Sequence, residues 1–216
     1  MGAMIEVDQQ CPSAEVLTRV CDVLLQEGVL VMPTDSVYGI GCLATPGNPA
    51  RARVFEIKER PADMTLPWLV SDASELERLG VDIPVWATAL AQEFWPGALT
   101  LVVKASAQVP SEYQRTDSGT IALRVPDSML VRELARRVGP LAVTSANTHG
   151  VDAAVSGRSV EERIVTLADL TLDSGPAPLA IASTIVDCTG TEPVILREGA
   201  IPAIDIMRIA LGASSA

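Results

Sequence analysis

The chain has 216 residues, of which 48% are hydrophobic and 20% are charged, a composition typical of a globular protein with a large core. Twenty-seven acidic and 16 basic residues give a net charge of −11, and aromatic residues make up only 3%. Gripping nucleic-acid phosphates needs a basic face and binding single strands needs aromatic platforms, so a direct nucleic-acid-binding protein is disfavoured.

No apolar run reaches the ~18 residues that cross a bilayer, and the N-terminus lacks the charged and apolar regions of a signal peptide. We therefore expect a cytoplasmic protein without a membrane partner, with residues 1–3 added ahead of a natural start at Met4. Four cysteines are present: Cys11, Cys21, Cys42 and Cys188. Their spacing contains no C-x-x-C pair, so it predicts neither a zinc site nor a disulfide framework.

Hydrophobic periodicity and Gly or Pro boundaries predict helices and short strands that intermingle along the chain. In chain order the predicted elements are helix 13–27, strand 29–32, helix 49–58, strand 67–70, helix 72–80, helix 84–94, strand 99–103, strand 119–125, helix 128–138, strand 141–144, helix 160–170, strands 181–186 and 194–196, and helix 202–211. With no repeat and no linker, we expect one α/β domain over residues 4–212 and a frayed tail at 213–216.

A polar stretch follows the first predicted strand, at 33–41, and we interpret it as a loop in which two glycines keep the backbone open. Lys58, one of only two lysines in the chain, stands two residues before Arg60 at the end of a predicted helix. Such a pair favours an anionic ligand. The alternative is structural, because cations at a helix C-terminus also complement the helix dipole.

Several blocks together carry a resemblance. They are PTDSVYGIG, KERP, SAN, STIVD and ILREGAI, in that order. This pattern resembles the YrdC-like family of threonylcarbamoyl-AMP synthases, whose Lys-x-Arg and Ser-x-Asn motifs would be 58–60 and 145–147 here. The match extends over about residues 16–201. It implies the family's short single-domain form, with a twisted mixed sheet flanked by helices and a concave, locally positive cleft.

The resemblance also implies an activity. The family's reaction joins ATP, L-threonine and bicarbonate into threonylcarbamoyl-AMP and releases pyrophosphate, a nucleotidyltransferase step in the t6A modification of tRNA. The product would pass to downstream tRNA threonylcarbamoyl transferase machinery. No covalent nucleophile is required, so no catalytic residue is assigned. Mg²⁺ is expected with ATP rather than in a dedicated metal site, and Asp35 and Asp187 are the carboxylates nearest the motifs.

Residue roles follow from positions in the matching blocks. The implied nucleotide-binding residues are Lys58, Arg60, Thr120, Asn147 and Arg197. The implied threonine-binding residues are Ser36, Arg124, Ser145 and Ser183. We expect Lys58 and Arg60 to be largely solvent-facing, so that their loss changes stability by less than ~0.5 kcal/mol. We expect Arg124 to project into the cleft and grip the threonine carboxylate with both arms of its guanidinium.

This chain departs from the family pattern at Met64, Leu69 and Val155, where polar residues are common, and His149 follows the Ser-Ala-Asn motif. Two alternatives therefore stay open. One is a paralogue of the same fold with other carbamoyl or adenylate chemistry. The other is a non-catalytic module that binds nucleotide or RNA. The sequence leaves the acceptor amine, the oligomeric state and the role of His149 undecided.

Overall fold

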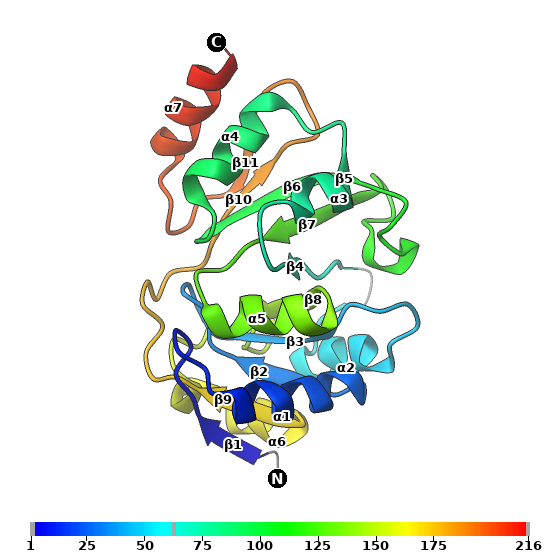
Figure 1. Ribbon diagram of the computed structural model, residues 1–216, viewed down its shortest axis with the longest axis vertical. Helices are drawn as coiled ribbons and strands as arrows, with labels where there is room; N and C mark the ends of the chain where they lie inside the picture. The colour runs from blue at the N-terminus through cyan, green and yellow to red at the C-terminus, as the bar shows by residue number, and fades with distance from the viewer. Residues whose placement is uncertain (1–2, 62–63, 215–216) are drawn as a thin grey trace.

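The computed structural model describes residues 3–61 and 64–214, and these form a mixed sheet flanked by helices (Figure 1). Within the described residues the eleven-stranded sheet has the order β1-β9-β2-β3-β8-β4-β7-β6-β10-β11, with β5 paired to β6. The strands are β1 (Ala3–Glu6), β2 (Leu30–Met32), β3 (Gly39–Leu43), β4 (Trp68–Leu69), β5 (Gly80–Val81), β6 (Leu99–Ala105), β7 (Thr120–Arg124), β8 (Leu141–Ser145), β9 (Leu170–Asp173), β10 (Thr184–Asp187) and β11 (Val194–Arg197). Parallel and antiparallel pairs alternate irregularly, and the predicted α/β class is confirmed.

The helices are distributed over both halves of the molecule and also across its middle (Figure 1). They are α1 (Ala14–Leu25), α2 (Pro49–Lys58), α3 (Glu75–Leu79), α4 (Val85–Phe94), α5 (Met129–Val138), α6 (Glu162–Leu167) and α7 (Ala203–Ser214), with short 3-10 turns at Ser111–Tyr113 and Gly157–Ser159. Helices α1 and α5 pack against each other over the lower half of the sheet, and α4 packs against α7 at the upper end. None of the helices in the described part of the chain is long and apolar enough to cross a membrane.

The pleat of β2 separates two hydrophobic cores. Leu30 and Met32 join the core under α1 and α5, whereas Val29 and Val31 join the larger core on the other face. Successive side chains of a strand point to opposite faces, so a strand that is apolar throughout must be covered on both sides. The continuous apolar run at 29–32 was thus a correct signal for a fully buried strand.

Residues 39–43 form strand β3, which corrects the expectation of a loop. The glycines allow a close approach to β8: a Cβ on Gly41 would lie 2.3 Å from the carbonyl oxygen of Ala142, and one on Gly39 would lie 2.5 Å from Cγ1 of Val143. Glycine is depleted in strands because it has no side chain to pack, so local preference predicted a turn. Tertiary pairing with β8 determines the outcome.

Other elements also differ from the prediction: strand 181–186 is observed as β10 at 184–187, helix 72–80 is observed as α3 at 75–79, and three further differences have a clear cause. Helix α6 ends at Leu167, and the residues from Leu170 form β9, whose pairing with β1 and β2 draws the chain out of the helix. Strand β1 was not predicted, and its short apolar run carries little periodicity. Helix α7 continues through Gly212 to Ser214, and a single glycine near a helix end costs only about 1 kcal/mol. Residues 1–2 and 215–216, at the two expected chain ends, lie outside the described residues.

Candidate functional site

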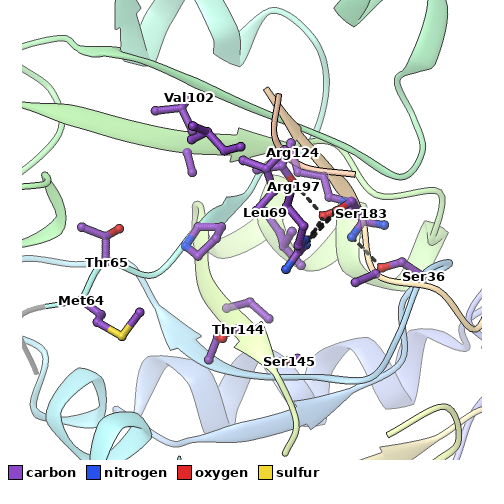
Figure 2. Close-up of a pocket in the computed structure, with 18 of the residues that line it drawn as sticks. Ser36, Met64, Thr65, Leu69, Val102, Arg124, Thr144, Ser145, Ser183 and Arg197 are labelled. Carbon is purple, nitrogen blue, oxygen red and sulfur yellow. Dashed lines mark hydrogen bonds between the residues drawn. The ribbon is translucent and has the colours of Figure 1, made fainter. Parts of the chain in front are cut away.

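A cleft of about 750 Å³ opens where several strands and one helix end. It lies over β6, β7 and β10, and its opposite wall comprises the end of α2, the end of β8 and the segments that follow them. All nine residues with roles implied by the motifs line this cleft: Ser36, Lys58, Arg60, Thr120, Arg124, Ser145, Asn147, Ser183 and Arg197. Figure 2 shows several of them converging from separate strands. The fold therefore brings together residues that are up to about 160 positions apart in the sequence.

Strand β7 forms the floor of the cleft. Thr120, Ala122 and Arg124 face the cavity, whereas the alternate residues Ile121 and Leu123 are buried in the larger core. Four residue steps along a strand span about 13 Å, so the hydroxyl of Thr120 and the guanidinium of Arg124 belong to opposite ends of the floor. A ligand that contacted both would have to be extended.

Arg124 is almost fully buried, with 6% of its surface exposed. Its Nη2 donates to Oδ1 of Asp35 at 2.5 Å, its Nη1 donates to Oγ of Ser36 at 2.7 Å, and its Nε donates to the carbonyl of Gly97 at 2.9 Å. Burial lowers the pKa of Arg124, and the neighbouring Asp35 carboxylate opposes that effect. Arg124 lines the cleft, as expected for a guanidinium that projects into it, but both terminal nitrogens already hold a protein partner, so each keeps one further N–H.

Arg197 and Ser183 meet at the same end of the cleft (Figure 2). Arg197 donates from Nη2 and Nε to the Ser183 carbonyl, at 2.7 and 3.1 Å, and from Nη2 to Oγ of Ser183 at 3.2 Å. That hydroxyl also shares a hydrogen bond with Oγ1 of Thr100 at 2.9 Å. Arg197 was assigned to the nucleotide and Ser183 to threonine, so the two implied groups of residues are in direct contact here.

On the opposite wall, Lys58 is buried, with only 2% of its surface exposed. Its Nζ donates to the carbonyl oxygens of Ser145 at 2.5 Å and Asn147 at 2.6 Å. Burial lowers the pKa of Lys58 from 10.5 to about 8; nearby Arg60 adds to the shift and Glu161 opposes it. The expectation of a solvent-facing lysine is wrong. An ammonium has three N–H donors, so one remains beyond these two bonds.

Arg60 is half-buried beside Lys58, and it too is less exposed than expected. Its Nη1 donates to Oγ1 of Thr144 at 3.0 Å, its Nη2 to the carbonyl of Thr65 at 3.3 Å, and its Nε contacts Sδ of Met64 at 3.1 Å. Burial lowers the pKa of Arg60. Met64, one of the departures from the family pattern, therefore contacts one of the two motif cations directly.

The side-chain amide of Asn147 holds the segment that follows β8. Nδ2 of Asn147 donates to the carbonyls of Thr148 and Val151 at 2.8 and 2.7 Å, and its Oδ1 is buried without a partner among the described residues. The backbone N–H of His149 donates to the carbonyl of Lys58 at 2.9 Å, and His149 also lines the cleft. Asn147 thus shapes the wall of the cleft from within the loop.

Cations outnumber carboxylates around the cavity. Its described lining includes Lys58, Arg60, Arg115, Arg124 and Arg197, against Asp117 and Asp187. This local excess within an acidic chain favours anionic ligands. Oδ1 of Asp187 accepts hydrogen bonds from the N–H and hydroxyl of Thr189. Asp35 lies behind Arg124 and does not line the cleft. Among the described residues, no group of three or more His, Cys, Asp or Glu could hold a metal ion.

The three residues that depart from the family pattern differ in their position relative to the cleft. Met64 and Leu69 line the cleft, whereas Val155 does not. Sequence reasoning missed several polar lining residues, among them Thr100, a hydroxyl within an apolar strand, and Arg115, in the segment before β7. The alternation of β6 could have placed Thr100 and Val102 on one face, but nothing local distinguishes Arg115 from a solvated surface arginine.

All four cysteines are free, and Cys21, Cys42 and Cys188 are buried.

A family model described as "Telomere recombination", that of Sua5/YciO/YrdC, matches residues 22–199. The chain is 36% identical over 198 residues to the threonylcarbamoyl-AMP synthase of Pyrococcus abyssi, an alignment covering 88% of this chain and 56% of that protein. It is 40% identical over 173 residues to a putative threonylcarbamoyl-AMP synthase of Mycobacterium tuberculosis, covering 79% and 78%. This chain thus spans little more than half the length of the Pyrococcus relative.

Two solved structures of such relatives have the same fold as this chain. The crystal structure of P. abyssi Sua5 complexed with L-threonine superimposes with a TM-score of 0.87 at 32% identity, covering 96% of this chain and 60% of that one. The crystal structure of Escherichia coli YciO gives a TM-score of 0.86 at 25% identity, covering 96% of this chain and all of that one.

Proposed function

This chain belongs to the Sua5/YciO/YrdC family, and we propose that it is an L-threonylcarbamoyladenylate synthase. The reaction would convert L-threonine, bicarbonate and ATP into threonylcarbamoyl-AMP, pyrophosphate and water. The observation that carries the proposal is the single cleft lined by every residue that the motifs implied. Relatives from Pyrococcus and Mycobacterium that carry the name of this activity support it.

The triphosphate would bind the wall formed by Lys58 and Arg60. Both side chains are held by neutral acceptors, two carbonyls for Lys58 and a hydroxyl and a carbonyl for Arg60. Neutral partners orient a cation without cancelling its charge, so the charge is available to phosphate oxygens. Positive groups fixed in advance also stabilise the negative charge that develops on departing pyrophosphate.

The amino acid would bind at the Arg124 end of the floor. Three of the five N–H donors of Arg124 are used by Asp35, Ser36 and Gly97, which fixes the plane of the guanidinium and leaves two donors for a carboxylate. The Ser183 hydroxyl lies at the same end. Arg197, bonded to Ser183, would then stand where the carbamate of the amino acid meets the α-phosphate of the nucleotide.

Mg²⁺ would arrive with ATP, since magnesium keeps several waters and leans on phosphate oxygens. Asp187 fits this role because its carboxylate lines the cleft and only one of its oxygens is bonded to Thr189. Asp35 fits it poorly because it is paired with Arg124. The ion would neutralise phosphate charge; the residues of this chain would bind, orient and exclude water.

The product would be used in t6A modification of tRNA, and we propose that it passes in the cytoplasm to a separate threonylcarbamoyl transferase. The net charge of −11 disfavours a direct grip on tRNA by this chain. A mixed anhydride such as threonylcarbamoyl-AMP is prone to hydrolysis, so the acceptor step should follow soon after release.

The test is to incubate the protein with ATP, bicarbonate and labelled L-threonine, and to measure both the labelled adenylate and pyrophosphate. We expect pyrophosphate release that depends on threonine and bicarbonate together. ATP binding without turnover under these conditions would instead indicate a non-catalytic nucleotide-binding module. Arg124→Lys serves as a matched variant that keeps the charge of the cleft.

A paralogue with another acceptor is the second candidate. The likeness to E. coli YciO covers 96% of this chain and all of that one, and YciO is named as an uncharacterised protein. Met64 and Leu69 also give the cleft apolar contacts. Replacing labelled threonine with a panel of amino acids and other amines separates the two candidates, because the paralogue would release pyrophosphate with a different amine.

A further inference from the structure

The loop that follows β8 is anchored by a carboxylate outside the cleft. Oε1 of Glu161 accepts the backbone N–H of Thr148 at 2.6 Å, and Oε2 accepts the Thr148 hydroxyl at 2.7 Å. Glu161 stands at the N-terminus of α6 and belongs to none of the motifs. It does not line the cleft. Both of its oxygens are thus occupied by a single loop residue.

Thr148 sits between the groups that hold Lys58. The carbonyls that accept from the Lys58 ammonium belong to Ser145 and Asn147, just before Thr148, and the N–H of His149, just after it, donates to the Lys58 carbonyl. The anchor therefore lies at the centre of the segment that wraps around the lysine. Fixing Thr148 fixes both sets of contacts.

A second residue of α6 strengthens this connection. Nη2 of Arg163 donates to the carbonyl of Ile57, next to Lys58, and also to Oγ1 of Thr148 at 3.2 Å. It lies 3.4 Å from Oε1 of Glu59 as well. Helix α6 consequently holds the end of α2 and the loop after β8 at one fixed separation.

We propose that Glu161 is a positioning residue of the cleft: by anchoring Thr148 it holds the carbonyls of Ser145 and Asn147 around the Lys58 ammonium. The remaining N–H of Lys58 is thereby aimed at an anionic ligand. The identity of that ligand as a nucleoside triphosphate rests on the proposed function. The placement of Lys58 itself can be examined without any ligand.

The charges around Lys58 give this arrangement a measurable signature. The charged or titratable groups that face it from its own segment, the loop and α6 are Glu59, Arg60, His149, Glu161 and Arg163. Glu161 raises the pKa of Lys58, whereas burial and Arg60 lower it, with a result of about 8. Removing the carboxylate charge should therefore make Lys58 lose its proton at lower pH.

Because the chain has only two lysines, the titration can be followed directly. Protein labelled with ¹³C in lysine gives two side-chain signals by NMR, and Lys104→Arg assigns them. We expect Lys58 to titrate near pH 8 in the wild type and at lower pH in Glu161→Gln. Glu162→Gln, which removes the same charge from the next, exposed residue, is the matched control and should leave the titration unchanged. A Lys58 titration that is identical in wild type and Glu161→Gln overturns the proposal.

Variants of Thr148 test the anchor separately from the charge. Thr148→Ser keeps the hydroxyl, whereas Thr148→Val removes it and leaves Glu161 in place. We expect the valine variant to bind ATP roughly tenfold to hundredfold more weakly at pH 7, the range for losing one hydrogen bond to a charged group, and the serine variant to bind like the wild type. Equal ATP affinity in both overturns the positioning role. A wild type that binds no ATP refutes the proposed function instead, and the lysine titration still decides the role of Glu161.

Discussion

Replacing Lys58 with methionine should remove a pH-dependent part of the free energy of unfolding. Methionine is close to lysine in length and fills the same space without a charge. In the wild type the ammonium is 2% exposed and held by the carbonyls of Ser145 and Asn147, so its ionisation differs strongly between the folded and unfolded states. The size and sign of the effect follow from that difference.

Burial lowers the pKa of Lys58 from 10.5, its value in the unfolded chain, to about 8 in the folded protein. Each pKa unit corresponds to about 1.4 kcal/mol, so the full effect is about 3 kcal/mol. Between pH 8 and 10.5 the unfolded state binds more protons, and the wild type therefore gains stability as the pH rises through this window. Stated in the other direction, the contribution is fully present above pH 10.5 and is lost as the pH falls through about 8.

The assay is urea denaturation of the wild type, Lys58→Met and Lys104→Met at intervals from pH 7 to pH 10. Burial raises the pKa of Tyr38 and of Cys42 to about 12 each, which weakens the fold at high pH, but all variants share this background. The stability of the wild type relative to Lys58→Met should rise by roughly 2–3 kcal/mol across the range. Lys104, an exposed lysine paired with Asp82, should give no such rise. Parallel curves for the wild type and Lys58→Met would refute the buried, partly neutralised lysine.

Three further outcomes concern ligands. Arg124→Lys should raise the KM for threonine roughly tenfold to hundredfold and the KM for ATP less, because lysine keeps the charge but loses the two-pronged guanidinium that Asp35 holds. Steady-state kinetics with each substrate varied would show the opposite order if the two ends of the cleft were assigned the wrong way round. Arg60→Ala should weaken ATP binding measured by calorimetry. An unchanged affinity would mean that Arg60 has only a structural role, through its hydrogen bonds to Thr144 and Thr65. ATP affinity should fall as the pH rises through about 8 and be about tenfold weaker at pH 9 than at pH 7, since ATP favours the protonated form of Lys58; a flat profile would contradict this.

The membership of the cleft could be predicted from the sequence through the family resemblance, because its separate motif blocks all point to one site. Strand assignment alone would not bring Arg124 and Ser145 together, since each is the last residue of its strand and β7 and β8 run in opposite directions. The helix that carries Lys58 was also predictable, since Pro49 begins α2 and Pro61 lies just past its end, where a proline stops a helix. These are local signals, each with a direct physical cause.

What the sequence did not reveal is the partner of each cation. The burial of Lys58 depends on two carbonyls almost ninety residues away, and backbone carbonyls have no sequence signature. The pairing of Arg124 with Asp35 was likewise hidden, because Asp35 reads as ordinary turn chemistry after a strand. Strand β3 was missed for a related reason: only contact with β8 explains why glycines occupy Gly39 and Gly41. Long-range contacts override local preference in each case.

The cations that line the cleft differ in whether their hydrogen-bond partners are neutral or charged. Lys58 and Arg60 are held by carbonyls and a hydroxyl, none of which carries a charge, so their wall is positive at pH 7 and suits a polyanion. Arg124 is held by a carboxylate, which cancels most of its charge while fixing its plane. A neutralised guanidinium recognises a group by geometry more than by net charge, and this suits a zwitterionic amino acid better than a triphosphate. The overall charge of −11 is therefore no obstacle to nucleotide binding, because Lys58, Arg60 and Arg197 line the cleft and their hydrogen-bond partners are neutral.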